Sequence, residues 1–301
     1  MAFQRIAIFG CGLIGGSFAL GLKKNGYGGE ILGWDREEIL RKAKQRGAID
    51  RGTTVLAEAV AEADLVYLAT PVVLILELLP QVGQHARAGA LVTDTGSTKA
   101  RICRLAREAL PERISFLGGH PMAGKESSGI ENADPDLFVG AKYVVIEEAR
   151  KKADPSPAFG GIGMASVKEE FLGWVRRLGA EPLEMDAETH DWAVGLVSHL
   201  PQLLSTALAS AVWDETDEDG LPLSLAASGF RDMTRLAASS YDIWRDICLT
   251  NSDNLGRALD RLAQKLERLR TLLRSKELAE EFEKAQQTCA ALRAAGRKNN
   301  E

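Results

Sequence analysis

A glycine-rich turn near the beginning of the chain limits the possible folds more than any other feature. The apolar run Arg5–Phe9 leads into Gly10-Cys-Gly-Leu-Ile-Gly15, and the helical pattern Leu13–Lys24 follows directly. A short apolar run is typical of a buried strand, and apolar residues at helical spacing indicate an amphipathic helix. A strand, a turn with glycines at this spacing and a helix form the opening unit of dinucleotide-binding folds.

Each glycine of this turn has its own physical task. Gly10 makes the tight turn, Gly12 lets the backbone approach a pyrophosphate, and Gly15 allows the helix to pack closely on the strand. Leu13 and Ile14 lie at the helix N-terminus, where free N–H groups and a partial positive charge face the phosphates. We predict that all five residues form the phosphate part of a cofactor site.

An acidic residue ends the second predicted strand, Glu30–Asp35. It lies 20 residues after the last glycine of the turn. A carboxylate at this position accepts hydrogen bonds from the adenosine ribose and repels a 2′-phosphate, so Asp35 favours NAD over NADP. Arg36 weakens this preference, because an arginine can pair with that phosphate.

Further apolar runs at Leu65–Ala69 and Ala90–Asp94 are each followed by a helical pattern. This alternation predicts a doubly wound parallel sheet with helices on both faces. Ligands of such sheets lie at the carboxyl ends of the strands. We therefore expect Thr70, Pro71 and Thr95 to border the cofactor, although a plain strand-ending turn explains Thr70 and Pro71 equally well.

The composition changes after residue 146. Residues 147–163 are rich in Lys, Ala, Pro and Gly and are predicted to be a linker. A helix, one last strand at Ala180–Glu184 and an almost entirely helical remainder follow. We predict an α/β, Rossmann-type domain in residues 1–150, extending to about 184, and a mainly α-helical domain for substrate binding and dimerisation in residues 185–301.

Charge and composition exclude several classes of protein. A net charge of −5 argues against a basic nucleic-acid binder. The chain has neither a signal-peptide pattern nor an apolar stretch long enough to span a membrane, so we expect a cytoplasmic protein with no membrane partner. Its four cysteines form no Cys-x-x-Cys pair, so we expect reduced thiols and no metal site.

The most unusual stretch is Gly118-Gly-His-Pro-Met-Ala-Gly-Lys-Glu126. A histidine between glycines and a proline suits neither a helix nor a strand, so we expect a loop that fixes the imidazole of His120. With an ordinary pKa of about 6.5, this side chain can take the hydroxyl proton when an alcohol loses a hydride to NAD. A histidine with only structural hydrogen bonds is the alternative.

A second histidine lies in Val197-Ser-His-Leu-Pro201, within the long apolar pattern His190–Trp213. Pro201 should kink this helix and bring Ser198 and His199 to one place. A buried, hydrogen-bonded His199 is an equally good interpretation. The other two histidines give weaker signals: His85 lies at a polar helix end, and His190 lies near a helix start.

With these pieces placed, the chain resembles the prephenate/arogenate dehydrogenase family of tyrosine biosynthesis. The resemblance covers nearly the whole chain and is carried by the matching stretches Gly10–Leu20, Asp94–Lys99, Gly118–Gly129, Val197–Pro201 and Gly229–Trp244. It implies NAD-dependent oxidative decarboxylation of prephenate to 4-hydroxyphenylpyruvate and CO2, or of arogenate to tyrosine, by a homodimer.

The resemblance also implies roles for individual residues. His120 would hydrogen-bond the ring hydroxyl as base or polariser, Ser97 would share that hydroxyl or orient His120, and Arg235 would anchor a substrate carboxylate. Further residues would line the pocket or its mouth, with one of them, a tryptophan, contributed across the dimer interface; they are Lys99, Glu126, Ser198, His199 and Trp244.

One position departs from the family pattern. Many relatives carry a second histidine after Ser-His-Leu-Pro, whereas this chain has Gln202. A neutral amide can donate or accept. Gln202 could therefore face the keto group of prephenate or the amine of arogenate, and the choice between these substrates stays open.

Two other classes of protein would keep the cofactor motif. A β-hydroxyacid dehydrogenase or imine reductase would carry a catalytic lysine on the helix between the domains, yet residues 187–213 contain no lysine. A non-enzymatic NAD sensor would not need His120 and Arg235 together. Both alternatives are weaker than an NAD-dependent dehydrogenase acting on prephenate.

Overall fold

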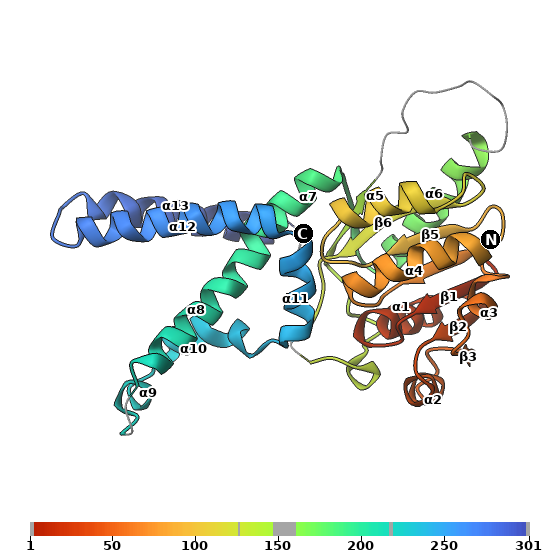
Figure 1. Ribbon diagram of the computed structural model, residues 1–301, viewed down its shortest axis with the longest axis horizontal. Coiled ribbons are helices and arrows are strands. Elements are labelled where there is room, and N and C mark those ends of the chain that lie inside the picture. Colours follow the sequence, from red (N-terminus) through yellow and green to blue (C-terminus); the bar gives the residue numbers. More distant parts are fainter. Residues whose placement is uncertain (1–2, 126, 147–160, 217–218, 299–301) are drawn as a thin grey trace.

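The computed structural model describes residues 3–125, 127–146, 161–216 and 219–298. It divides into an α/β part built on one twisted sheet and a helical part that projects from one side of it (Figure 1). In the described ranges, no helix is both long and apolar enough to cross a membrane.

The sheet has eight strands in the order β3-β2-β1-β4-β5-β6-β7-β8. The strands are parallel except for the antiparallel pair β6–β7. Their bounds are β1 Arg5–Phe9, β2 Glu30–Trp34, β3 Arg51–Thr53, β4 Leu65–Leu68, β5 Leu91–Asp94, β6 Ser115–Pro121, β7 Lys142–Ile146 and β8 Glu181–Met185. The strand order reverses between β1 and β4, which is where doubly wound sheets open a ligand crevice.

Helices cover both faces of the sheet. One layer consists of α1 (Leu13–Lys24), α2 (Glu37–Gln45) and α6 (Gly161–Arg177), and the other of α3 (Leu56–Val60), α4 (Val72–His85) and α5 (Ala100–Ala109). In the first layer the ring of Phe18 stacks on that of Tyr67, with the centroids 3.9 Å apart. The strand β4, which is buried on both faces, is a continuous apolar run for this reason.

Most predicted elements are confirmed, and three expectations are corrected. The strand β3 was not predicted, because its three residues, Arg51-Gly-Thr53, include no large apolar side chain. The end of the predicted linker, 161–163, forms the first turn of α6, while residues 147–160 lie outside the described residues. His120 belongs to β6 and not to a loop.

The helical part begins directly after β8, so the predicted boundary at 184–185 falls at the last strand. It contains α7 (Ala187–Val194), a π-helical turn (Gly195–His199), α8 (Leu200–Asp214), α9 (Leu221–Ser224), α10 (Ser228–Thr234), a 3₁₀ turn (Arg235–Ala238), α11 (Tyr241–Thr250), α12 (Ser252–Leu272) and α13 (Leu278–Lys298). Figure 1 shows α8 and the antiparallel α12–α13 hairpin pointing away from the sheet.

The predicted break at Pro201 takes the form of the π-helical turn. Pro201 is the second residue of α8 and directly follows helical backbone, so its missing N–H interrupts the α-helical hydrogen bonds at this point. The preceding residues Gly195–His199 take the wider π form. Two α-helices with different directions are thereby joined without a loop.

Two buried carboxylates of the helical part hold it on the α/β part. Asp191 of α7 accepts the backbone N–H groups of Lys99 (2.6 Å) and Ala100 (2.9 Å) at the start of α5. Asp246 of α11 accepts the N–H of Val73 (3.2 Å) at the start of α4. Helix N-termini carry unpaired N–H groups and a partial positive charge, so each carboxylate satisfies donors that would otherwise be buried without a partner.

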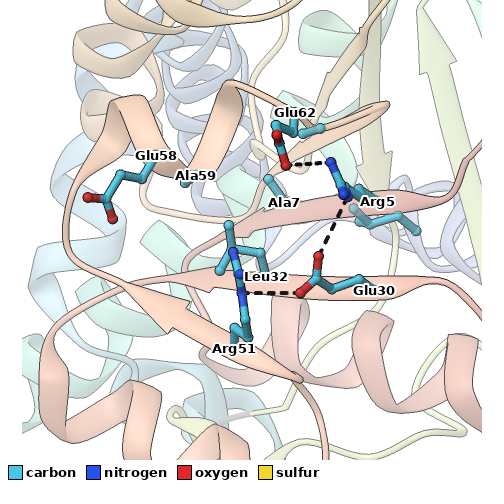
Figure 2. Close-up of a pocket in the computed structure, with 10 residues that line it drawn as sticks. Arg5, Ala7, Glu30, Leu32, Arg51, Glu58, Ala59 and Glu62 are labelled. Atoms are coloured by element: carbon cyan, nitrogen blue, oxygen red, sulfur yellow. Dashed lines mark hydrogen bonds and ion pairs between the residues drawn. The ribbon is translucent and has the colours of Figure 1, made fainter.

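A small cavity lies at the amino-terminal ends of β1 and β2, on the opposite edge of the sheet from the glycine-rich turn. Figure 2 shows it closed by ion pairs of Arg5 with Glu30 and Glu62, and of Arg51 with Glu30. Its volume of about 20 Å³ has room for little more than a single water molecule. The cavity lies far from the glycine-rich turn. The ion pairs around it close this end of the sheet, and we assign no ligand-binding site to it.

Two helical glycines give a matched test of this packing. A Cβ atom at Gly15 would overlap the carbonyl oxygen of Gly10, whereas a Cβ at Gly173 of α6 would meet nothing within 4 Å. We expect Gly15→Ala to lower the free energy of unfolding by at least about 2 kcal/mol. Gly173→Ala should raise it by about 0.5–1 kcal/mol. Urea unfolding measures both, and equal effects of the two substitutions would contradict the packing described here.

Candidate active site

The glycine-rich turn has the geometry that a pyrophosphate site needs. Gly10 has φ +87°, in the left-handed region that favours glycine. A Cβ at Gly12 would meet no atom within 4 Å, so the backbone here faces open space. The first turn of α1 has no acidic residue and no side-chain cap, so its N–H groups and positive dipole end stay available to an anion.

Asp35 fixes this turn to the end of β2. Its Oδ2 accepts the N–H of Cys11 at 2.8 Å, and its Oδ1 accepts the N–H of Arg36 at 2.7 Å. Each carboxylate oxygen has a second lone pair, and the side chain is partly exposed. The predicted ribose contact stays a prediction that this geometry permits.

Thr70, Pro71 and Thr95 lie together at the carboxyl ends of β4 and β5. The side chain of Thr70 borders Gly10, and its buried Oγ1 has no hydrogen-bond partner among the described residues. Buried hydroxyls are almost always paired, so an unpaired one beside the phosphate turn fits a bound ligand. These features agree with the dinucleotide that the sequence predicts.

Two glycines explain why His120 lies on a strand. A Cβ at Gly119 would come 2.5 Å from the carbonyl oxygen of Asp94, and one at Gly118 would come 2.9 Å from the sulfur of Cys103. Only glycines allow β6 to pack this tightly against β5 and α5. The extended backbone then carries His120 to the carboxyl end of the sheet, opposite Val144 of β7.

Beneath His120 lies a buried ion pair. Lys99 is 0% exposed, and its ammonium group donates to Asp94 and to the carbonyl oxygen of Gly119 (2.7 Å). Asp94 also accepts the N–H groups of Gly96 (2.8 Å) and Gly119 (3.2 Å). The predicted substrate or cofactor contact of Lys99 stays a prediction, and in the structure its side chain braces the strand that carries His120.

His120 has a partner that the sequence did not reveal. Its Nδ1 lies 2.9 Å from Nε2 of His190, whose Nδ1 lies 2.8 Å from Oδ1 of Asp191. Asp186 caps α7 by accepting the N–H of Thr189, which sets the helix phase that turns His190 inward. The sequence signal that could have revealed this partner is the pair His190-Asp191 in the first helix after the sheet.

The surroundings of His120 keep its imidazole neutral. Burial lowers its pKa well below the ordinary value of about 6.5, and the neighbouring His190, Lys99 and His199 lower it further. A neutral imidazole at physiological pH has a lone pair available for a proton. The site therefore contains a base at the carboxyl edge of the sheet.

His199 lies deeper in the helical part. It is 2% exposed, its Nδ1 lies 3.2 Å from Nδ2 of Asn251, and its ring meets that of Trp244 edge to face at 5.8 Å. Burial lowers its pKa to about 4, so it is neutral at physiological pH. Asn251, another residue missed at the sequence level, also donates to the backbone oxygen of Asp191 at 2.8 Å and so joins this group to α7.

The other predicted site residues take varied positions. Ser97 is partly exposed just after β5, Ser198 is partly exposed on the π-helical turn, and Arg235 is exposed at the start of the 3₁₀ turn. The amide of Gln202 is used within the helical part, since Nε2 donates to Leu236 (2.8 Å) and Oε1 accepts from Ser239 (3.3 Å). Glu126 lies outside the described residues. The roles of these residues stay predictions.

The described ranges contain no group of three or more His, Cys, Asp or Glu side chains arranged to hold a metal ion. The groups that are present are a phosphate turn, a ribose-side carboxylate and a neutral histidine along one sheet edge. Such an edge, next to a helical domain, defines a two-domain, dinucleotide-dependent oxidoreductase.

Comparison with known proteins identifies the family. Residues 18–155 match the nucleotide-binding domain of prephenate dehydrogenase, and residues 186–287 match its dimerization domain. The prephenate dehydrogenase of Lactococcus lactis is 38% identical over 272 residues, covering 87% of this chain and 71% of the relative. The chain belongs to the prephenate dehydrogenase family and is an NAD-dependent oxidoreductase.

Two solved structures share the whole architecture. Prephenate dehydrogenase from Aquifex aeolicus, in complex with hydroxyphenyl propionate and NAD+, superposes with a TM-score of 0.85 at 30% identity, covering 96% of this chain and 98% of that one. The arogenate dehydrogenase of Synechocystis superposes with a TM-score of 0.77 at 31% identity, covering 97% and 99% of the two chains.

Cofactor preference can be tested by binding alone. We expect Asp35→Ser to reduce the preference for NADH over NADPH by at least about tenfold, equivalent to removing roughly 1.4 kcal/mol of charge repulsion. Arg36 remains in place to meet the 2′-phosphate. Dissociation constants come from titrations of nicotinamide fluorescence.

Asp50 provides the matched control for this substitution. It also accepts a backbone N–H, that of Ile31 at 2.7 Å, but at the other end of β2. Asp50→Ser should leave the ratio of the two dissociation constants unchanged. An unchanged ratio in Asp35→Ser would remove Asp35 from the ribose site.

Proposed function

We propose that this chain catalyses the NAD-dependent oxidative decarboxylation of prephenate to 4-hydroxyphenylpyruvate and CO2, with His120 as the base. The neutral imidazole of His120 at the carboxyl edge of a dinucleotide-binding sheet is the observation that carries the proposal. Family membership supports the substrate, because prephenate dehydrogenases match the chain across both parts.

Residues of this chain bind the dinucleotide and place the base near its reactive end. The turn Gly10–Gly15 and the carboxylate of Asp35 hold the dinucleotide, and Thr70 offers it an unpaired hydroxyl. NAD, when bound, supplies the nicotinamide that accepts the hydride. β6 lies three strands from β1, about 14 Å at ordinary strand spacing, so His120 lies toward the nicotinamide end of a dinucleotide that runs along this edge.

His120 takes the proton of the ring hydroxyl as the hydride leaves the same carbon. The C–C bond to the ring carboxylate then breaks and CO2 leaves. The electron pair of that bond completes the aromatic ring as a phenolate, to which protonated His120 returns the proton. Ser97 and Arg235 are assigned the roles that the sequence predicted, at the hydroxyl and at a substrate carboxylate. Exposure of both side chains at the surface of the α/β and helical parts is compatible with these contacts.

Arogenate is the second candidate substrate. The similarity to the arogenate dehydrogenase of Synechocystis favours it, at 31% identity over nearly the full chain. Gln202 was expected to face the keto group of prephenate or the amine of arogenate, and in the structure both ends of its amide are bonded to Leu236 and Ser239. We assign the distinction between the keto and amino side chains to residues other than Gln202.

We also propose that the protein is a cytoplasmic homodimer formed through a helical domain that starts near residue 185. Leu259 and Leu266 of α12 and Leu273, directly after it, follow one another at intervals of seven and remain exposed, as does Phe282 of α13, which is 62% exposed. Large apolar side chains repeated along one helix face in this way are typical of a protein–protein contact. The match to a dimerization domain supports a second copy as its partner.

The substrate is tested by following NADH formation with prephenate and with arogenate, each offered with NAD and with NADP. We expect turnover of prephenate with NAD and much lower rates with NADP. Turnover of arogenate alone would replace the substrate and keep the chemistry. The absence of turnover with all four pairs would refute the proposed function.

Substitution of the base and variation of pH test the role of His120. We expect His120→Asn to lower kcat about 100-fold or more, whereas His85→Asn, at the exposed end of α4, should leave it unchanged. A base acts when it is neutral, above its pKa, and the pKa of His120 is lowered. In the native enzyme kcat/KM should therefore stay constant down through about pH 6.5 and fall only in more acid solution. A fall that begins above this pH would contradict the assignment.

A further inference from the structure

A chain of hydrogen bonds connects His120 to the boundary between the two parts of the molecule. It runs from Nδ1 of His120 to Nε2 of His190 (2.9 Å) and from Nδ1 of His190 to Oδ1 of Asp191 (2.8 Å). His120 belongs to the sheet, while His190 and Asp191 belong to α7. His190 and Asp191 are almost completely buried, at 0% and 1% exposed.

Asp191 is fixed as a hydrogen-bond acceptor. Its Oδ1 receives the N–H of Lys99 and its Oδ2 receives the N–H of Ala100, both in the first turn of α5. Backbone N–H groups at a helix N-terminus stabilise an anion, and an ionised carboxylate has no proton to donate. The atom that faces Asp191 Oδ1 from His190 must therefore be a protonated nitrogen.

The acceptor role of Asp191 fixes the proton positions on His190 and, through it, on His120. If Nδ1 of neutral His190 carries the proton, its Nε2 has a lone pair and can only accept. Nδ1 of His120 must then donate to it, which leaves the lone pair of His120 on Nε2. We propose that Asp191 and His190 are positioning residues that fix this tautomer of His120, so that the nitrogen turned away from α7 is the one that receives the substrate proton. The inference rests on the proposed role of His120 as base.

Other titratable groups around His120 make a fixed tautomer valuable. Lys99 and Asp94 lie below it, and His199 approaches from the helical part. If His190 carried two protons, it would donate to Nδ1 of His120 and force the proton of His120 onto Nε2, where it would block the reaction. The carboxylate of Asp191 determines the direction of every hydrogen bond in this series.

The tautomer is thereby coupled to the docking of the helical part. Both carboxylates that join the two parts bind helix N-termini, but only Asp191 also contacts a histidine; Asp246 contacts Val73 and Arg245. The two side chains are equally well buried, at 1% and 2% exposed. Asp246 is therefore a matched control for the purely structural part of the interaction.

Two amide substitutions of His190, to asparagine and to glutamine, separate its role in orienting His120 from its role in packing. A glutamine amide reaches the position of the imidazole Nε2 and can accept from His120, whereas an asparagine amide reaches only the position of Nδ1. We expect His190→Asn to lower kcat about 10- to 100-fold and His190→Gln to restore most of that loss, with little change in the KM for either substrate. Equal kcat values for the two variants would overturn the role of His190.

Asp191→Asn tests the origin of the constraint. An asparagine NH2 group in the place of Oδ1 donates to His190 and reverses every donor and acceptor in the series, and it also loses the bond from the N–H of Lys99. We expect kcat to fall about 10- to 100-fold in this variant, but to stay within about threefold in Asp246→Asn. Both variants should show a similar drop in melting temperature, since each loses one interdomain carboxylate. Equal losses of kcat in the two variants would show a structural role only.

The tautomer itself can be observed without turnover. The chain has four histidines, so ¹⁵N-histidine labelling gives a simple long-range ¹H–¹⁵N spectrum of the full protein. The signals of His120 are those lost in His120→Asn. We expect a protonated Nδ1 and an unprotonated Nε2 in the native protein, and the reverse in Asp191→Asn.

The NMR spectra test the tautomer of His120, and the kcat measurements test its role as base, so failure of one proposal can be distinguished from failure of the other. A proton on Nε2 of His120 in the native protein, or the same tautomer in Asp191→Asn as in the native protein, would overturn the inference. Full activity of His120→Asn together with the expected spectra would instead refute the proposed function and leave the hydrogen-bond series intact.

Discussion

The carboxylate of Asp191 at the N-terminus of α5 is the interaction on which the arrangement of the site depends. It satisfies two buried backbone donors, Lys99 N–H and Ala100 N–H, and it joins the helical part to the sheet. Because α7 is fixed at this point, His190 meets His120 at hydrogen-bond distance. The buried carboxylate of Asp191 therefore caps α5 and also positions the histidines of the site.

The buried charges around the base form a balanced set. Lys99 is paired with Asp94, Asp191 is paired with the dipole of α5 and with His190, and the pKa values of His120 itself and of His199 are lowered. An unpaired charge in this environment would be strongly destabilising. The pairing leaves a neutral, partly buried imidazole as the group that can change its protonation state during the reaction.

The cofactor half of the site could be predicted from the sequence because it is local. Each glycine of Gly10–Gly15 acts within one strand, turn and helix, and Asp35 ends the next strand. The chemical half depends on contacts between residues 70 (His120 and His190) and 92 (Lys99 and Asp191) positions apart, which no local pattern encodes. The strand position of His120 was missed for the same reason, since Gly118 and Gly119 fit a strand only where β5 and α5 press against it.

The division of the site between two parts of the chain has a consequence for biosynthesis of the protein itself. The phosphate turn and Asp35 leave the ribosome before α7, and domains generally fold in the order in which they are synthesised. A chain made only as far as the sheet already contains the residues of the dinucleotide site, but its His120 lacks the partner His190. The oriented base therefore forms last, when the helices dock on the sheet.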